Sequence, residues 1–140
     1  MTKKVQQVMT SQPQSVRRTT TVRSAAEIME REDVGSLPVV EDGGVLMGIV
    51  TDRDIVVRVV AAGRNVDEVS VGEILTEHPV LVFPDESLDH AMELMAKHQI
   101  RRLPVVYDTQ LVGMLTQADI AQEAKDKQAG HVLEAISQHE

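Results

Sequence analysis

The sequence predicts an α+β fold built from two copies of one unit. Two observations support this fold class. The chain matches itself at a shift of 66 residues, which becomes 65 after a one-residue gap between Gly44 and Gly48. Each copy also has the pattern helix, strand, strand, helix, with a short leading strand before it. One such unit is too small to hold a core alone, so we expect the two to pack around a pseudo-twofold axis.

The internal match joins residues of many types, and it predicts how the chain is divided. The identical pairs are Thr10/Thr76, Pro13/Pro79, Val16/Val82, Ala25/Ala91, Glu27/Glu93, Met29/Met95, Asp42/Asp108, Gly48/Gly113, Thr51/Thr116, Asp54/Asp119 and Ile55/Ile120, with Leu-Pro-Val-Val at 37–40 and 103–106. We predict a first unit at residues 1–66, a second at 67–128 and a tail at 129–140, with a polar linker at 64–70. The spacing of Val132, Leu133 and Ile136 predicts either a short docking helix or a frayed end.

The elements of each copy follow from apolar spacing and turn residues. Apolar residues at i, i+3, i+4 and i+7 predict an amphipathic helix, and β-branched runs on either side of a turn predict two strands. In the first copy we expect an extended segment at 13–16, a helix over 22–29, strands at 37–40 and 45–50, and a helix from Thr51 that ends at Gly63. In the second copy we expect an extended segment at 79–82, a helix over 88–95, strands at 103–107 and 111–115, and a helix from Thr116.

Composition excludes several classes of function. The net charge is −8 and the chain has only two aromatic residues, which argues against binding polymeric nucleic acid. With no cysteine, it can form neither a disulfide nor a thiolate metal site. No apolar run approaches the roughly 20 residues of a membrane span, and no apolar segment follows the basic N-terminus. We therefore expect a cytoplasmic protein with no membrane partner.

The pattern Gly-x-x-Thr-x-x-Asp occurs twice, at residues 48–54 and 113–119, each time where an apolar strand turns into a helix. The threonine is placed as an N-cap, where free N–H groups could hold an anionic oxygen. The aspartate follows one turn later, and its carboxylate suits the paired hydroxyls of a ribose. The structural alternative is a threonine–aspartate capping box that binds nothing. No P-loop, dinucleotide fingerprint or hydrolase elbow is present, so we expect no enzyme.

Taken together, these motifs resemble those of cystathionine β-synthase (CBS) domains. Both copies have a threonine before the first proline (Met9-Thr10 and Leu75-Thr76), the Leu-Pro-Val-Val strand, and Gly-x-x-Thr-x-x-Asp. The pair resembles one Bateman module over residues 5 to 125. Thr51-Asp52-Arg53-Asp54-Ile55 followed by Ala61-Ala62-Gly63 is similar to small stand-alone bacterial members.

The resemblance implies an adenosyl-ligand site in each half, in clefts between the units. Thr51 and Thr116 would contact phosphate, and Asp54 and Asp119 would contact ribose hydroxyls. The other residues that it implies are Ile49, Val50, Met114 and Leu115 as walls, Val16 and Val82 at the base pocket, and Gly35, Ser36, Arg101 and Arg102 where main chain approaches the base. Phosphate needs positive charge on this acidic protein, so Arg53, Arg101 and Arg102 are the expected suppliers, with Arg17 and Arg18 behind them. Because the flanks of the two motifs differ, we expect unequal sites.

Two functions of different classes remain open. The first is a regulatory sensor of an adenosyl ligand such as AMP, ADP, ATP or a related compound. The second is a nucleotide-independent interaction module in which the threonines and aspartates are only helix caps. The resemblance implies a homodimer under both, acting on a protein partner that the sequence does not name. We expect no required cofactor and no metal site, since the five histidines lack metal-ligand spacing.

Overall fold

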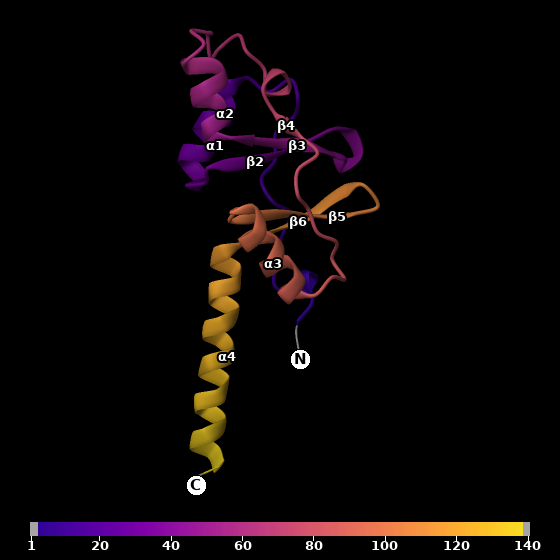
Figure 1. Cartoon of the computed structure of the whole chain (residues 1–140), viewed down its shortest axis with the longest axis vertical. Helices are drawn as coiled ribbons and strands as arrows, with labels where there is room; N and C mark the ends of the chain where they lie inside the picture. Colours follow the sequence, from indigo (N-terminus) through magenta and orange to yellow (C-terminus); the bar gives the residue numbers. More distant parts are fainter. Residues whose placement is uncertain (1–2, 139–140) are drawn as a thin grey trace.

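The computed structural model describes residues 3–138, with side chains up to residue 127. It has two units, one above the other along the long axis, and each contains a three-stranded antiparallel sheet (Figure 1). The helices of both units lie on the left of the view and the hairpin tips on the right. The elements are β1 (Thr10–Ser11), α1 (Val22–Glu32), β2 (Ser36–Val40), β3 (Leu46–Thr51), α2 (Asp52–Ile55) continued by a π-helical segment (Val56–Val60), β4 (Thr76–Glu77), α3 (Leu88–His98), β5 (Arg102–Tyr107), β6 (Gln110–Thr116) and α4 (Gln117–Gln138). The predicted α+β fold is confirmed.

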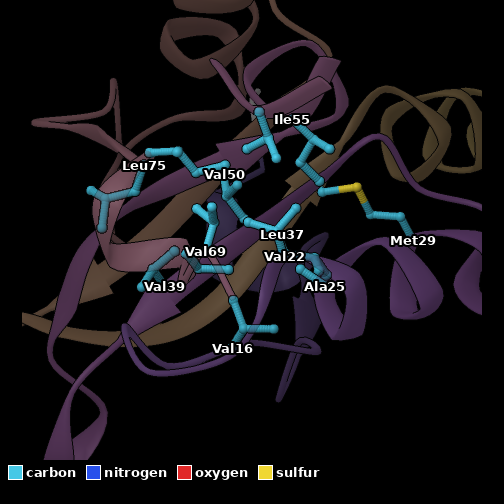
Figure 2. Packing of buried hydrophobic residues seen from close by; sticks show 13 residues of the cluster. Val16, Val22, Ala25, Met29, Leu37, Val39, Val50, Ile55, Val69 and Leu75 are labelled. Atoms are coloured by element: carbon cyan, nitrogen blue, oxygen red, sulfur yellow. The ribbon is translucent and has the colours of Figure 1, made fainter. Parts of the chain in front are cut away.

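The first helix of each unit is delimited by its own caps. Thr21 accepts a hydrogen bond from the N–H of Ser24 at the start of α1, and Ser87 accepts one from the N–H of His90 at the start of α3. Both helices end at a residue in the left-handed conformation, Asp33 and Gln99 respectively. The faces of α1 and β2–β3 meet in the first core, whose packing is shown in Figure 2.

Each predicted extended segment, 13–16 or 79–82, is preceded by a two-residue strand that begins three residues before it and that the sequence did not predict. These strands are β1 and β4, while Val16 and Val82 make only single parallel bridges to Val39 and Val105. The backbone turns immediately after each short strand, because Gln12 and His78 have φ of 51° and 54°. The prolines after these turns carry no N–H to continue a ladder, so both strands stop after two residues.

Each sequence copy supplies a segment to the fold of the other. β1 pairs with β6, placing Thr10 opposite Met114, and β4 pairs with β3, placing Thr76 opposite Ile49. Residues 5–11 (the N-terminal crossing segment) therefore complete the sheet of the second unit, and residues 69–77 (the central crossing segment) complete the first. The cores show the same exchange: Val5 is buried in the second, and the first contains Val69, Val71, Ile74 and Leu75.

The segment predicted as a polar linker is part of the fold, because it caps α1. The carbonyl groups of Val69 and Val66 accept the N–H groups of Val22 and Arg23, at 2.9 and 3.0 Å. These N–H groups have no partner within the helix. The two ends of the linker also hold Glu73, because a hydrogen bond from the N–H of Ser70, together with one from Arg64, lowers the pKa of its carboxyl group. The linker thus fixes the start of the central crossing segment against α1.

The glycine of each Gly-x-x-Thr-x-x-Asp motif lies where a crossing segment passes over the sheet. A Cβ atom on Gly48 would overlap the carbonyl oxygen of Thr76, and one on Gly113 would lie 3.0 Å from the carbonyl oxygen of Thr10. At Gly48 only a residue without a side chain allows this approach of two backbones, whereas at Gly113 the Met9 side chain and the crossing backbone would have to shift. The glycine is therefore required by the exchange of segments at Gly48, and it eases the same approach at Gly113.

The tail forms neither a separate docking helix nor an irregular end within the described residues. α4 runs without a break from Gln117 to Gln138 and extends away from the second unit (Figure 1). The side chains of Val132, Leu133 and Ile136 lie outside the described part of the chain. Among residues 3–138, no helix has both the length and the apolar character that crossing a membrane requires.

Truncating a buried side chain of a crossing segment is expected to lower the free energy of unfolding as much as truncating a core side chain of the unit that the segment completes. Ile74 is only 2% exposed, so Ile74→Ala should lower the free energy of unfolding by about 3 kcal/mol. Met92→Ala is the control, because Met92 is 43% exposed and should cost less than about 1 kcal/mol. Urea denaturation followed by circular dichroism measures both. A loss below about 1 kcal/mol for Ile74→Ala would contradict the exchange.

A methyl group at Gly48 tests the close approach of the backbones. Gly48→Ala should lower stability by about 2 kcal/mol, because the central crossing segment has to move. Gly35→Ala is the control, since its nearest neighbour is the exposed Asp52 carboxylate, which can rotate away. Thermal melts of the two variants should differ clearly, and equal melting temperatures would show that the approach is not tight.

Candidate functional site

Both motifs form reciprocal capping boxes. The Thr51 hydroxyl accepts the N–H of Asp54 at 3.0 Å, and Asp54 Oδ2 accepts the N–H of Thr51 at 3.0 Å. In the second unit, the Thr116 hydroxyl and Asp119 make the same two bonds, at 3.1 and 3.0 Å. The structural alternative for the motif is therefore present in both copies. It leaves room for a second role, because a carboxylate has about four lone-pair sites.

A threonine from the crossing segment also faces each aspartate. The Thr76 hydroxyl lies 3.4 Å from Asp54 Oδ2, and the Thr10 hydroxyl lies 3.2 Å from Asp119 Oδ1. Sequence reasoning did not include these residues in the site. The signal was available, since Thr10 and Thr76 are one of the identical pairs of the repeat.

The two aspartates differ in the charged side chain that lies one turn further along the helix. After Asp54 this residue is Arg58, with its Nη1 atom 3.7 Å from Asp54 Oδ1 and 2.6 Å from the carbonyl oxygen of Ile74. The equivalent position after Asp119 is Glu123, whose carboxylate pairs with Lys3 Nζ at 3.0 Å. The first motif thus has a cation beside its aspartate, and the second has a carboxylate with a lysine behind it.

A cleft of about 770 Å³ lies between the two units and brings the two motifs together. The predicted site residues that line it are Gly35, Ser36, Thr51, Arg53, Arg101, Arg102 and Thr116. Its remaining walls are Asp33, Val34, Asp52, Gln99, Ile100, Gln117 and Ala118. The loop before each hairpin is tied to its motif, because the carbonyl groups of Gly35 and Arg101 accept the N–H groups of Asp52 and Gln117, both at 2.9 Å.

Other predicted site residues lie apart from this cleft. Val16 and Val50 belong to the first core, Val82 and Leu115 belong to the second, and Met114 is 4% exposed. Ile49 is half-buried, and the capped aspartates Asp54 and Asp119 lie behind their threonines rather than on the cleft wall. The side chains of the core valines and of Leu115 therefore face the packed interior in this structure.

Arg17 and Arg18 also lie away from the cleft. Arg17 is paired with Asp42, and Arg18 Nε lies 3.2 Å from Glu41 Oε1. They line a separate depression beside the hairpin of the first unit. In the part of the chain that the structure describes, no group of three histidine or acidic side chains is placed to hold a metal ion.

Comparison with known proteins identifies the family. The family model described as CBS domain matches residues 5–61 and 71–126. The CBS domain-containing protein YhcV of Bacillus subtilis is 42% identical over 134 residues, which cover 95% of this chain and 94% of that protein.

Two solved structures are similar over nearly their whole length. The structure of CBSX2, a CBS-pair protein from Arabidopsis thaliana, in complex with AMP has a TM-score of 0.79 and 28% identity, covering 89% of this chain and 98% of that one. The CBS domain pair of protein MJ0100, in complex with 5′-methylthioadenosine and S-adenosyl-L-methionine, has a TM-score of 0.77 and 28% identity, covering 91% and 99%. The chain therefore belongs to the CBS domain family and consists of a tandem pair of CBS domains.

Proposed function

We propose that this CBS pair is a regulatory sensor, not an enzyme, and that it binds an adenosyl ligand such as AMP, ADP, ATP or a related compound between its two units. The observation that carries the proposal is the meeting of both Thr-x-x-Asp motifs at one cleft that also holds Arg53, Arg101 and Arg102. Two structural neighbours are complexes with adenosyl compounds, which supports this class of ligand.

The residues at the cleft match the parts of a nucleotide. The three arginines supply local positive charge on a chain of net charge −8, as a phosphate requires. Asp54 and Asp119 lie behind the cleft threonines, and their carboxylates would accept ribose hydroxyls from a ligand that reaches past these threonines. A mononucleotide has about 23 non-hydrogen atoms, and about −0.3 kcal/mol for each gives a Kd near 10 μM. Such an affinity would suit the sensing of a metabolite at micromolar to millimolar concentrations.

The alternative is a homodimeric interaction module that needs no nucleotide. It is favoured by the exposed valines of the second helix in the first unit: Val56, Val57 and Val60 are 57%, 50% and 59% exposed. Apolar side chains gathered on one exposed helical turn are typical of a protein contact. The homodimer, the cytoplasmic location and the regulated protein partner remain predictions.

Thermal melts with AMP, ADP, ATP, 5′-methylthioadenosine and S-adenosylmethionine test the sensor directly. At 100 times its Kd, a bound ligand adds about 2.7 kcal/mol, which should raise Tm by about 10 °C. Inosine monophosphate is the control for recognition of the base. Asp54→Ala and Asp119→Ala, made singly, should each reduce the shift if both motifs bind. If none of the adenosyl compounds moves the melting temperature, the interaction module becomes the better account.

A further inference from the structure

We propose that a depression on the second unit, beside Tyr107, is a docking site for a basic and apolar peptide segment of a partner protein. Its volume is about 370 Å³. It is lined by Gln6, Met9, Pro84, Asp85, Tyr107 and Val112. None of these residues lines the cleft between the two units, so docking here is independent of nucleotide binding in that cleft.

The first unit has a counterpart of this depression, in which the charged side chains are paired with one another. The repeat places Arg18 where the second unit has Pro84, and Glu41 where it has Tyr107. Arg18 Nε lies 3.2 Å from Glu41 Oε1, and Arg17 is paired with Asp42 in the same way. The second unit has neither arginine, and its residues at the four equivalent positions are Phe83, Pro84, Tyr107 and Asp108. The two copies thus keep the hollow but differ in what it can bind.

The side chains around this depression are of the kinds that protein contacts favour. Of the large apolar side chains that the structure describes, Tyr107 is the most exposed, at 67%. Its ring therefore contributes little to the core and is available for contact. Met9 lies against Gly113 and supplies a flexible wall that can adapt to a bound side chain. Tyrosine and methionine are both enriched at interfaces, and tyrosine is frequent among the residues that dominate binding energy.

The turn that follows Tyr107 is held in place by the first unit. Asp108 and Thr109 have φ of 49° and 69°, as a two-residue hairpin turn requires. The N–H of Leu46 donates to the carbonyl oxygen of Thr109 at 3.1 Å, so the two hairpin tips lie side by side (Figure 1). Because this backbone is already fixed, little conformational freedom is lost when a partner contacts the tyrosine ring.

The edge of the depression is acidic. It is formed by segments 5–9, 83–86 and 107–112, which contain no lysine or arginine. Their carboxylates are Asp85, Glu86 and Asp108, and Lys4 precedes the first segment. Asp85 and Asp108 are exposed and form no ion pair with another described residue. A lysine or arginine beside an apolar side chain would pair with these carboxylates and stack on the tyrosine ring, whereas an acidic segment would be repelled.

A displayed library of random peptides, about twelve residues long and built without tyrosine or tryptophan, tests the site. The library is first depleted on Tyr107→Ala and then selected on the wild-type chain. Enriched peptides should carry lysine or arginine next to leucine, isoleucine, phenylalanine or methionine. As synthetic peptides they should bind Tyr107→Ala at least about tenfold more weakly, the effect of removing a dominant aromatic contact. The chain has one tyrosine and no tryptophan, so each peptide should also change the emission of Tyr107 itself.

The charge requirement is tested with variants and salt. Asp85→Asn and Asp108→Asn should each weaken the selected peptides about two- to fivefold, as expected for exposed ion pairs. Raising sodium chloride from about 50 to about 500 mM should weaken binding to the wild type and reduce that difference. Val57→Ala is the control, because Val57 is 50% exposed on the second helix of the first unit and outside the depression. It should change the affinity less than twofold, and melting temperatures report that all variants are folded.

The docking site is overturned if no peptide is enriched after depletion, if the enriched peptides are acidic or lack charge, or if their binding leaves the emission of Tyr107 unchanged. It is also overturned if the wild-type chain self-associates in analytical ultracentrifugation and Tyr107→Ala does not, since a second copy would then occupy the depression. The effect of AMP on the melting temperature should be the same for Tyr107→Ala and the wild type. Absence of that effect in both would count against the proposed function and leave the docking site standing.

Discussion

The two crossing segments are the contacts on which the rest of the structure depends. A hairpin and its helices leave one edge of the sheet and one side of the core open, and a segment from the other copy covers both. Each short strand has only two residues, so few hydrogen bonds attach it to the sheet. The crossing segments are therefore held mainly by burial of apolar side chains such as Ile74 and Val5. Because neither unit can bury its core without the other, the two should fold and unfold as one body.

The same contacts shape the site. A crossing segment can pass over the sheet only beside Gly48 or Gly113, and it then brings a threonine to the motif aspartate. The capping box occupies one oxygen of each aspartate and leaves acceptor sites on the same carboxylate, so the structural and functional interpretations of the motif do not exclude each other. The two copies differ in the side chains beside this shared motif. The residue four positions after the aspartate is Arg58 in the first copy and Glu123 in the second. A duplicated binding module can in this way keep one architecture and give its two sites different charge.

Local patterns in the sequence were sufficient to predict the hairpins and the first helix of each unit, because their periodicity and turn residues are set by neighbours in the chain. The position of the leading strands was not predictable in this way, since the partners of Thr10 and Thr76 lie more than 25 residues away along the chain in both cases. The resemblance grouped Val50 and Leu115 with the site walls. The two-residue alternation of β3 instead places Val50 in the first core, on the face opposite Ile49, and Leu115 of β6 is buried in the second core. The cleft joins loops from both units, which only the packed structure reveals.

The interlocking of the two units is tested most directly by native-state hydrogen exchange of the amides in β3 and β6. If the crossing segments couple the units, the most protected amides of both strands should report one opening free energy, equal to that of global unfolding. Ile74→Ala, a change in the core of the first unit, should then lower the opening free energy of both strands by the same amount. Exchange of β3 at a lower free energy than β6, with β6 unaffected by the substitution, would contradict the account.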